Sequence, residues 1–273
     1  MLSKEYYIGT MIYYQNLLNN MSVVTYGRHN GKEVLRYHYN DSKKLKEIAP
    51  TSKYWSKCKT LADERIEFTD RIRQLKTDYK NTWRTDINED MARYVVTEVV
   101  KHKLNKEFWE NLSDEKTSFP NDTNYYHKDD HFRSRVEVII ARILDELNLK
   151  YKYDVKITVG NNTYFADFTV YLPQFGCCFI IEYLGRLNDL DYIDDNTPKL
   201  RNYSKEGLFQ GEEIVFLCGS DIRMPPAEVI QEQIAAVINA IAKRHIIKKI
   251  YAFNLLLQPN PYIISRIFKT HGG

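Results

Sequence analysis

Two acidic residues lie in segments that predict buried or half-buried strands, where a charge rarely lacks a compensating partner. Glu182 lies near the end of CCFIIEYLG, whose apolar residues predict an almost wholly buried strand, and Asp167 lies in TYFADFTVYL, which reads as a half-buried strand. Burying an unpartnered carboxylate is costly, and two carboxylates at the ends of neighbouring strands repel each other unless a cation lies between them. Together with the backbone carbonyl of Tyr183 they supply the oxygen ligands that Mg²⁺ or Mn²⁺ prefers. The sequence therefore predicts a divalent-metal site at Asp167, Glu182 and Tyr183.

The elements that must position these acids read as a mixed α/β unit. Apolar periodicity predicts an amphipathic helix over residues 134–147 and three strands that contain the two acids. A second helix is expected over residues 198–206, ended by Gly207, and the apolar run EIVFLCG reads as a further buried strand. The expected order is α-β-β-β-α-β, with the strands at Tyr151–Val159, Thr163–Tyr171 and Cys177–Leu184. A long helix over residues 226–250 and a tail over residues 251–273 close the chain.

The first 130 residues have a different pattern. A helix is expected over residues 4–19, followed by a β-hairpin whose turn, Asn30-Gly31, favours positive φ angles. Two further helices are expected, from after Pro50 to Lys80 and over residues 89–111, and then a polar linker to residue 130. The chain is thus predicted to comprise a mainly helical region with a β-hairpin (1–130), an α/β domain (131–250) and a C-terminal tail (251–273).

A resemblance to a known family covers residues 132–219 and none of the N-terminal half. The segments FRSRVEVIIARILDELNLKYKYD, FADFTV, IIEYLGRLND and KLRNYSKEGLF resemble the PD-(D/E)XK nuclease superfamily. More narrowly, they resemble its branch in which Glu-x-x-Gly replaces Glu-x-Lys. The resemblance implies a restriction-endonuclease-like αβββαβ core, in which helices flank a mixed central sheet. The element order obtained from periodicity is the same.

The resemblance also implies roles for individual residues. Asp167 and Glu182 match the two metal-ligating acids, and Glu137 matches the first-helix glutamate that orients a metal-bound water or completes the metal's surroundings. Ala166 stands where a proline is usual. Leu184 stands where the motif lysine is expected, and in this branch a lysine from the following helix takes over that role.

Lys199 is the candidate for the transferred lysine, with Tyr203 on the same face of its helix. If Lys199 does not serve, the alternatives are another lysine or none; the other candidates are Lys152, Lys156 and Lys205. Arg133, Arg135 and Arg186, with Tyr203, are the expected nucleic-acid contacts, since the guanidinium group suits phosphate.

The function that follows is a Mg²⁺- or Mn²⁺-dependent endonuclease that hydrolyses phosphodiester bonds in nucleic acid, DNA rather than RNA. The setting expected is a defence or mobile-element system. The alternative is a catalytically inactive nuclease-fold subunit that binds nucleic acid or acts as a scaffold in a larger complex, and Leu184 keeps this alternative open. Residues 1–130 would then serve targeting or dimerisation, either in a homodimer or with a partner protein that selects the target.

Several residues also have plain structural interpretations. Ser134 and Glu137 fit a helix capping box, and the acidic run over residues 189–195 reads as a solvated loop rather than a second metal site. The histidines 102, 127 and 131 show no spacing for joint ligation, and the four cysteines form no Cys/His cluster, so no zinc site is expected. Cys177 and Cys178 read as small core residues.

Net charge and apolar runs limit the class of protein. The net charge of +3 excludes a coat that binds polyanions indiscriminately, so nucleic-acid contacts must come from local patches. The N-terminus lacks a signal-peptide pattern, and no apolar run approaches the roughly 18 residues of a membrane span. We therefore expect a cytoplasmic protein without a membrane contact.

Overall fold

The computed structural model describes residues 1–39, 44–97, 100–113, 115, 117, 124–220 and 222–249. The chain forms two compact units, an N-terminal unit over Tyr7–Val95 and a C-terminal unit that combines Met1–Tyr6 with Val96–Gly273. The boundary expected at residue 130 falls inside the C-terminal unit, and the expected tail lies outside the described residues. In the described ranges, no helix is long and apolar enough to cross a membrane.

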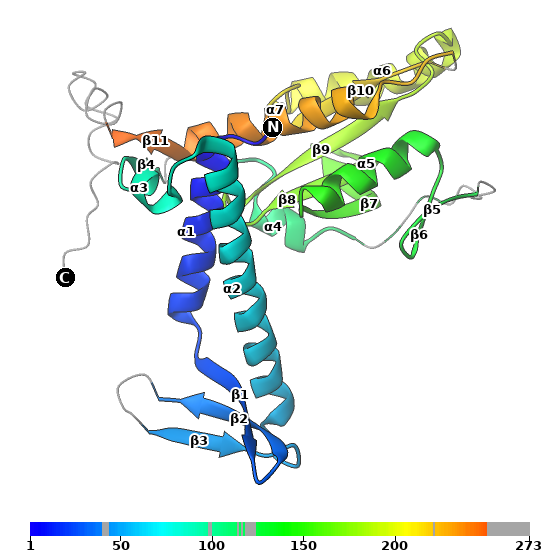
Figure 1. Cartoon of the computed structure of the whole chain (residues 1–273). Helices are drawn as coiled ribbons and strands as arrows, with labels where there is room; N and C mark the ends of the chain where they lie inside the picture. Colours follow the sequence, from blue (N-terminus) through cyan, green and yellow to red (C-terminus); the bar gives the residue numbers. More distant parts are fainter. Residues whose placement is uncertain are drawn as a thin grey trace. The chain divides into compact units, whose positions relative to one another are not determined.

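The N-terminal unit is built on two helices and a small sheet (Figure 1). Helix α1 (Lys4–Asn20) and the hairpin of β1 (Val23–His29) and β2 (Lys32–His38) confirm the sequence prediction. Asn30 and Gly31 take the positive φ angles, 49° and 76°, that the turn requires. A third strand, β3 (Leu45–Ile48), was not predicted, and it pairs antiparallel with β2.

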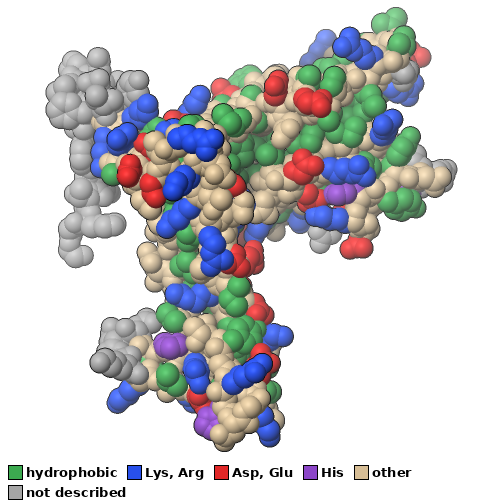
Figure 2. Space-filling model, viewed as in Figure 1, with side chains coloured by type: hydrophobic (Ala, Val, Ile, Leu, Met, Phe, Trp, Pro, Cys, Tyr) green, Lys and Arg blue, Asp and Glu red, His purple; other side chains and the backbone are tan. Residues whose placement is uncertain are grey.

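Helix α2 (Trp55–Trp83) confirms the predicted long helix, and its buried residues are Cys58, Ala62, Leu75 and Tyr79. Figure 1 shows α1 and α2 side by side, and the ring of Tyr14 lies 5.6 Å from that of Phe68. Further along, Tyr79 is fully buried and its ring lies 4.6 Å from that of Trp83. Lys and Arg side chains alternate with Asp and Glu along the visible face of α2 (Figure 2).

The helix predicted over residues 89–111 is wrong. The segment instead forms α3 (Ile87–Met91), β4 (Tyr94–Val96) and α4 (Lys106–Glu110), each of three to five residues. The β-branched residues Val95, Val96 and Thr97 favour extended backbone, although the apolar spacing also fits a helix. Asn105 caps α4 by accepting a hydrogen bond from the Phe108 backbone N–H, so the second helix starts anew rather than continuing the first.

The centre of the C-terminal unit is a four-stranded mixed sheet in the order β10-β9-β8-β7. The sheet contains β7 (Lys150–Val159), β8 (Asn162–Leu172), β9 (Cys177–Leu184) and β10 (Ile214–Cys218). Strand β8 is antiparallel to both β7 and β9, whereas β10 is parallel to β9. Helix α5 (Arg135–Glu146) precedes β7, and α6 (Leu190–Lys205) connects β9 with β10. The α-β-β-β-α-β order expected from the sequence is therefore present.

Helices that pack against this sheet position its functional edge. Buried α5 residues, among them Val136, Ile140 and Leu144, recur at helical spacing, which explains why this helix was predictable. Tyr203 of α6 packs with Ile180 in an apolar cluster that also includes Val155, Ile157 and Ile214. Helix α7 (Ala227–His245) contacts α5 and β10; it ends before the expected residue 250 and is followed by the short strand β11 (Ile246–Lys248).

Two segments near the sheet differ from expectation. The acidic run over residues 189–195 belongs to α6 and is not a loop, because Asp189 accepts a hydrogen bond from the Tyr192 backbone N–H and so caps the helix. The end of the expected linker forms a hairpin of β5 (Tyr125–His127) and β6 (Asp130–Phe132). His127 of this hairpin shares a hydrogen bond with Asp145 of α5 and Lys128 forms an ion pair with it, and these contacts hold the hairpin on the helix.

Candidate active site

A single pocket of about 1060 Å³ collects most of the residues singled out from the sequence. Its walls come from the start of α5, from β8, from the end of β9, from α6 and from the segment after β10. The predicted residues that line it are Arg133, Arg135, Glu137, Asp167, Glu182, Tyr183, Arg186 and Lys199. Residues spread over 67 positions of the chain, from 133 to 199, thus meet at one end of the sheet.

Glu182 is 3 % exposed, and each oxygen of its carboxylate has a partner on α6. Lys199 Nζ donates to Oε2 at 2.7 Å, and the Tyr203 hydroxyl donates to Oε1 at 2.6 Å. Lys199 Nζ also donates to the Phe165 carbonyl at 2.9 Å. A lysine from the following helix therefore contacts the acid itself.

The electrostatic state of Glu182 follows from its burial. Burial raises the pKa of Glu182 to about 7, with a contribution from the nearby Asp167, whereas Lys199 and Tyr203 lower it. Burial and Glu182 together raise the pKa of the Tyr203 hydroxyl far above its ordinary value, so it remains a hydrogen-bond donor. A cation beside the carboxylate favours the charged form, and Lys199 holds that position.

Asp167 lies next to Glu182 at the end of the β8–β9 ladder. It directly precedes Phe168, which pairs with Ile181, the residue before Glu182. Asp167 Oδ2 accepts a hydrogen bond from the Tyr183 backbone N–H at 2.7 Å. The two predicted metal ligands therefore stand on adjacent strands, as expected.

An interruption of the β7–β8 ladder lies beside Asp167. Pairing is present at Tyr153–Phe168 and at Val155–Ala166 but not between them, where Asp154 has a positive φ of 51°. Such irregularities often redirect side chains next to functional sites. Asp154 is buried, and its Oδ1 has no hydrogen-bond partner among the described residues.

Arg133 contacts three of the acids rather than standing free for a phosphate. Its Nη2 lies 2.8 Å from Asp167 Oδ1, its Nη1 lies 3.6 Å from Asp154 Oδ1, and its Nε lies 3.8 Å from Glu137 Oε1. The guanidinium group is always charged, so it neutralises part of the negative charge gathered here. Arg133 therefore lies inside the acidic cluster, and its contact with a flanking phosphate stays a prediction.

Glu137 forms the capping box that its sequence context allowed. The Ser134 hydroxyl accepts from the Glu137 backbone N–H at 3.2 Å, and Glu137 Oε2 accepts from the backbone N–H groups of Ser134 and Arg133. The Tyr153 hydroxyl donates to the same oxygen at 2.8 Å. Burial and the neighbouring Asp167 raise the pKa of Glu137, and Arg133 opposes this. The other carboxylate oxygen of Glu137, Oε1, faces Arg133 and is the atom that could take part in the candidate active site.

The remaining predicted contacts divide into two groups. Arg135 and Arg186 are exposed at the pocket, and Arg186 forms an ion pair with Asp189. Tyr203 is completely buried, so the prediction that it contacts nucleic acid is wrong. Its ring fills the core below α6, and its hydroxyl fixes Glu182 instead.

Sequence reasoning missed Asp154 and Tyr153, which complete the surroundings of Arg133 and Glu137. Asp154 lies in YKYDVKITV, where it takes a polar position of a regular alternating strand pattern, so the sequence carried no signal that it would be buried. The Tyr153 hydroxyl carried no signal, because a strand tyrosine more often packs its ring in the core.

The acids do not by themselves form a closed cage for a metal. Among the described residues, the group that brings three ligand atoms within 4.8 Å of one another is instead His102, Cys177 and His245. The expectation that no Cys/His cluster exists is therefore wrong. The site at Asp167, Glu182 and the Tyr183 carbonyl, an all-oxygen donor set, stays a prediction.

No protein-family model, curated protein or solved structure matches the chain.

Proposed function

We propose that this pocket is the active site of a metal-dependent nuclease that hydrolyses phosphodiester bonds in DNA. One observation carries the proposal: Lys199 Nζ lies 2.7 Å from Glu182 Oε2, in the pocket that also contains Asp167. Two acids on adjacent strands and a lysine on the next helix are the parts that the PD-(D/E)XK resemblance requires. The proposed fold is accordingly a restriction-endonuclease-like core.

The donor set fits Mg²⁺ or Mn²⁺. Asp167, Glu182 and the Tyr183 carbonyl would hold the ion, since these are hard oxygen donors and Mg²⁺ is commonly bound by one or two carboxylates. A bound ion would supply a water of lowered pKa and would neutralise charge on the scissile phosphate. Arg133 and Lys199 compensate the acids when no ion is present, as their contacts with Asp167 and Glu182 indicate.

Lys199 is placed to act on the reacting groups. An ammonium group has three N–H donors, and Phe165 and Glu182 use two of them. The third is available for an attacking water or for a phosphate oxygen. A fixed donor of this kind stabilises charge that develops in the transition state.

The arginines at the rim of the pocket support the proposal that the substrate is a polyanion. Arg135, Arg186 and Arg223 line it, and all three belong to exposed or partly exposed positions at its mouth. The guanidinium fork binds phosphate oxygens in pairs, so these arginines would hold the backbone on either side of the scissile bond. The N-terminal unit is proposed to serve targeting or dimerisation.

The inactive-scaffold alternative rested on Leu184, where the motif lysine is expected. The contact of Lys199 with Glu182 brings a lysine to the acid and supports the active enzyme over that alternative. The retention of Glu137, Asp167 and Glu182 in one pocket also favours an active enzyme.

A cleavage assay tests the proposal. The purified chain is incubated with Mg²⁺ or Mn²⁺ and with supercoiled plasmid, single-stranded DNA or RNA, beside Asp167→Asn and Glu182→Gln. We expect cleavage of DNA that depends on the metal and is lost in both variants. Cleavage that is unchanged in both variants would refute the site, and retained binding without cleavage by any form would favour the scaffold role.

A further inference from the structure

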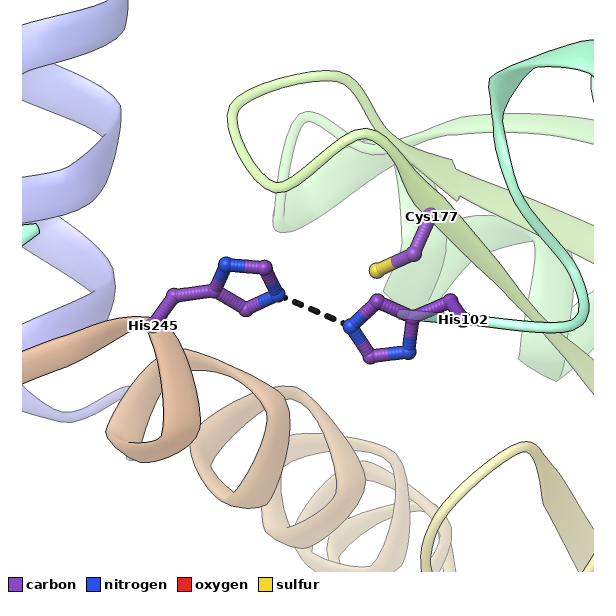
Figure 3. Close-up of side chains that lie close together, drawn as sticks. All are labelled: His102, Cys177 and His245. Carbon is purple, nitrogen blue, oxygen red and sulfur yellow. Dashed lines mark hydrogen bonds between the residues drawn. The ribbon is translucent and has the colours of Figure 1, made fainter. Parts of the chain in front are cut away.

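Three side chains from distant parts of the C-terminal unit meet outside the candidate active site (Figure 3). His102 lies in the segment before α4, Cys177 is the first residue of β9, and His245 is the last residue of α7. Cys177 is fully buried, His245 is 9 % exposed and His102 is partly buried. Their ligand atoms all lie within 4.8 Å of one another.

The two histidines face each other through their ring nitrogens. His102 Nε2 lies 2.8 Å from His245 Nε2, so one imidazole donates its N–H to the lone pair of the other. The rings are nearly parallel, at 16°, and Figure 3 shows the Cys177 sulfur directed toward the same space. Phe175 stacks on the ring of His245 at 5.1 Å and closes one side of the cluster.

The contact between the two rings requires at least one metal-binding lone pair. Because one Nε2 donates its proton to the other, the accepting imidazole carries no proton on its Nε2. Neutral imidazole has a free lone pair, which protonated imidazole lacks. The charge of Arg244, the nearest basic neighbour in sequence, is paired with Glu212 at 3.2 Å.

We propose that His102, Cys177 and His245 bind a zinc ion. Two imidazoles and one thiolate match the borderline-soft character of Zn²⁺, whereas the hard ion Mg²⁺ prefers oxygen. This proposal is independent of the nuclease function, because none of the three residues lines the active-site pocket.

The distance between the two imidazole nitrogens requires little rearrangement. A tetrahedral zinc ion holds nitrogens at about 2.0–2.1 Å and sulfur at about 2.3 Å, which places two ligand nitrogens about 3.3 Å apart. The observed separation is 2.8 Å, so the rings need to part by only about half an ångström. With three protein ligands, the fourth position is left to a water molecule.

Protons balance in a simple way. The Cys177 thiol loses its proton to solvent as the Zn–S bond forms, so one proton is released for each ion bound. The imidazole that donated its Nε2 proton keeps its charge of zero by carrying that proton on Nδ1 instead. Both Nε2 lone pairs are then available to the ion.

A bound ion would tie together the segment before α4, the first residue of β9 and the end of α7. Cys178, next to Cys177, already donates its backbone N–H to the Leu104 carbonyl at 2.6 Å, so the ion would reinforce an existing junction. An ion that binds the folded chain contributes its binding free energy to folding, and removal of the ion with a chelator should therefore lower the melting temperature.

The experiment measures metal binding and not cleavage. The full chain, stripped of metal, is titrated with Zn²⁺ alone by calorimetry and with Co²⁺ alone by absorption spectroscopy. We expect one ion per chain at this site and a thiolate-to-cobalt charge-transfer band in the near ultraviolet. Only a cysteine ligand gives that band, so Co²⁺ bound at Asp167 and Glu182 does not imitate it.

Matched variants locate the ion. Cys177→Ser should abolish the band, while Cys178→Ser, which changes the adjacent buried cysteine, should keep it. His102→Gln should weaken Zn²⁺ binding by at least the roughly 10- to 100-fold that loss of even an outer partner of a metal site costs. His131→Gln serves as its control and should bind as the wild type does.

The zinc proposal is overturned if the wild type gives no charge-transfer band, or if Cys177→Ser retains the band. If Cys177→Ser fails to fold, as judged by circular dichroism, His102→Gln decides, since His102 is the least buried of the three. Zn²⁺ affinity unchanged in a folded His102→Gln variant would equally refute the site.

Discussion

Lys199 Nζ and Glu182 Oε2 lie 2.7 Å apart although 17 positions separate the two residues in the chain. The contact joins the end of β9 to the second half of α6. The residue two positions after Glu182, where the nuclease motif would have a lysine, is Leu184. Lys199 brings a lysine to Glu182 from α6 instead.

Replacing Lys199 tests the role of this contact in turnover. Lys199→Ala should lower kcat for DNA cleavage by about 100-fold or more, as is usual when a fixed transition-state donor is removed. Metal affinity, measured by calorimetry with Mn²⁺, should remain, because Lys199 is not a ligand. Lys205→Ala is the control, since Lys205 is exposed at the end of the same helix. Unchanged kcat in Lys199→Ala would show that another lysine, or none, acts.

A lysine moved to the motif position should restore part of the activity. Leu184 lines the same pocket as Lys199. In the Lys199→Ala background, Leu184→Lys should therefore recover cleavage above the single variant, as measured under the same Mg²⁺ conditions. If the double variant folds and cleaves no faster than Lys199→Ala, the two positions are not equivalent.

Tyr203 is expected to act through Glu182 and not through DNA. Tyr203→Phe removes the hydroxyl that donates to Glu182 Oε1, and a hydrogen bond to a charged group is worth about 1.5–3 kcal/mol of stability. We expect lower kcat and a lower free energy of unfolding but unchanged DNA affinity, measured by fluorescence anisotropy. Tyr164→Phe, on a neighbouring ring, is the control. A loss of DNA affinity alone would contradict this assignment.

Glu137 has a structural role that can be separated from a site role. Ser134→Ala removes one half of the capping box and should cost about 1 kcal/mol of unfolding free energy without changing kcat. Glu137→Gln preserves the cap, because glutamine also fits this position, but it removes the negative charge. If Glu137 serves the metal site, Glu137→Gln lowers cleavage while stability changes little. If both variants cleave equally fast, Glu137 serves only as the cap of α5 and not in the candidate active site.

Acid should weaken the attachment of the β5–β6 hairpin to α5. Burial alone would raise the pKa of Asp145, but its hydrogen bonds with Lys128 and His127 lower it below its usual value of 3.8. The stabilisation is therefore fully present above pH 3.8 and is lost as the pH falls through the lowered folded value. Asp145→Asn should be less stable than wild type at pH 7, and the difference should vanish near pH 2.

Denaturant unfolding from pH 7 to pH 2 measures this difference. Glu146→Gln is the matched control, because Glu146 is the exposed neighbour of Asp145 at the end of α5. A difference between wild type and Asp145→Asn that does not change with pH would show that the ion pairs are not its source.

The sheet was predictable because its residues carry their own pattern. The apolar run around Glu182 and the turn glycines at 160 and 176 define strands and their ends without knowledge of the fold. The helix predicted over residues 89–111 failed because apolar spacing fitted a helix while Val95 and Val96 preferred a strand. The apolar spacing favoured a helix there and the residue propensities favoured a strand, and the structure follows the propensities.

The candidate site was predictable only in part. Asp167 and Glu182 could be found because acids within apolar strands are unusual. The contact of Arg133 with Asp167 depends on side-chain directions that a sequence does not contain. The meeting of His102 with His245 joins residues 143 positions apart, and no spacing rule connects them.

Diffraction from crystals soaked with Mn²⁺ tests directly whether Asp167 and Glu182 bind a metal. We predict an anomalous peak in the pocket, within coordinating distance of carboxylate oxygens of Asp167 and Glu182 and of the Tyr183 carbonyl. The same peak should be absent from Asp167→Asn crystals. If no peak is found between Asp167 and Glu182, with Arg133 still paired to Asp167 at saturating Mn²⁺, the pocket is not a metal-dependent active site.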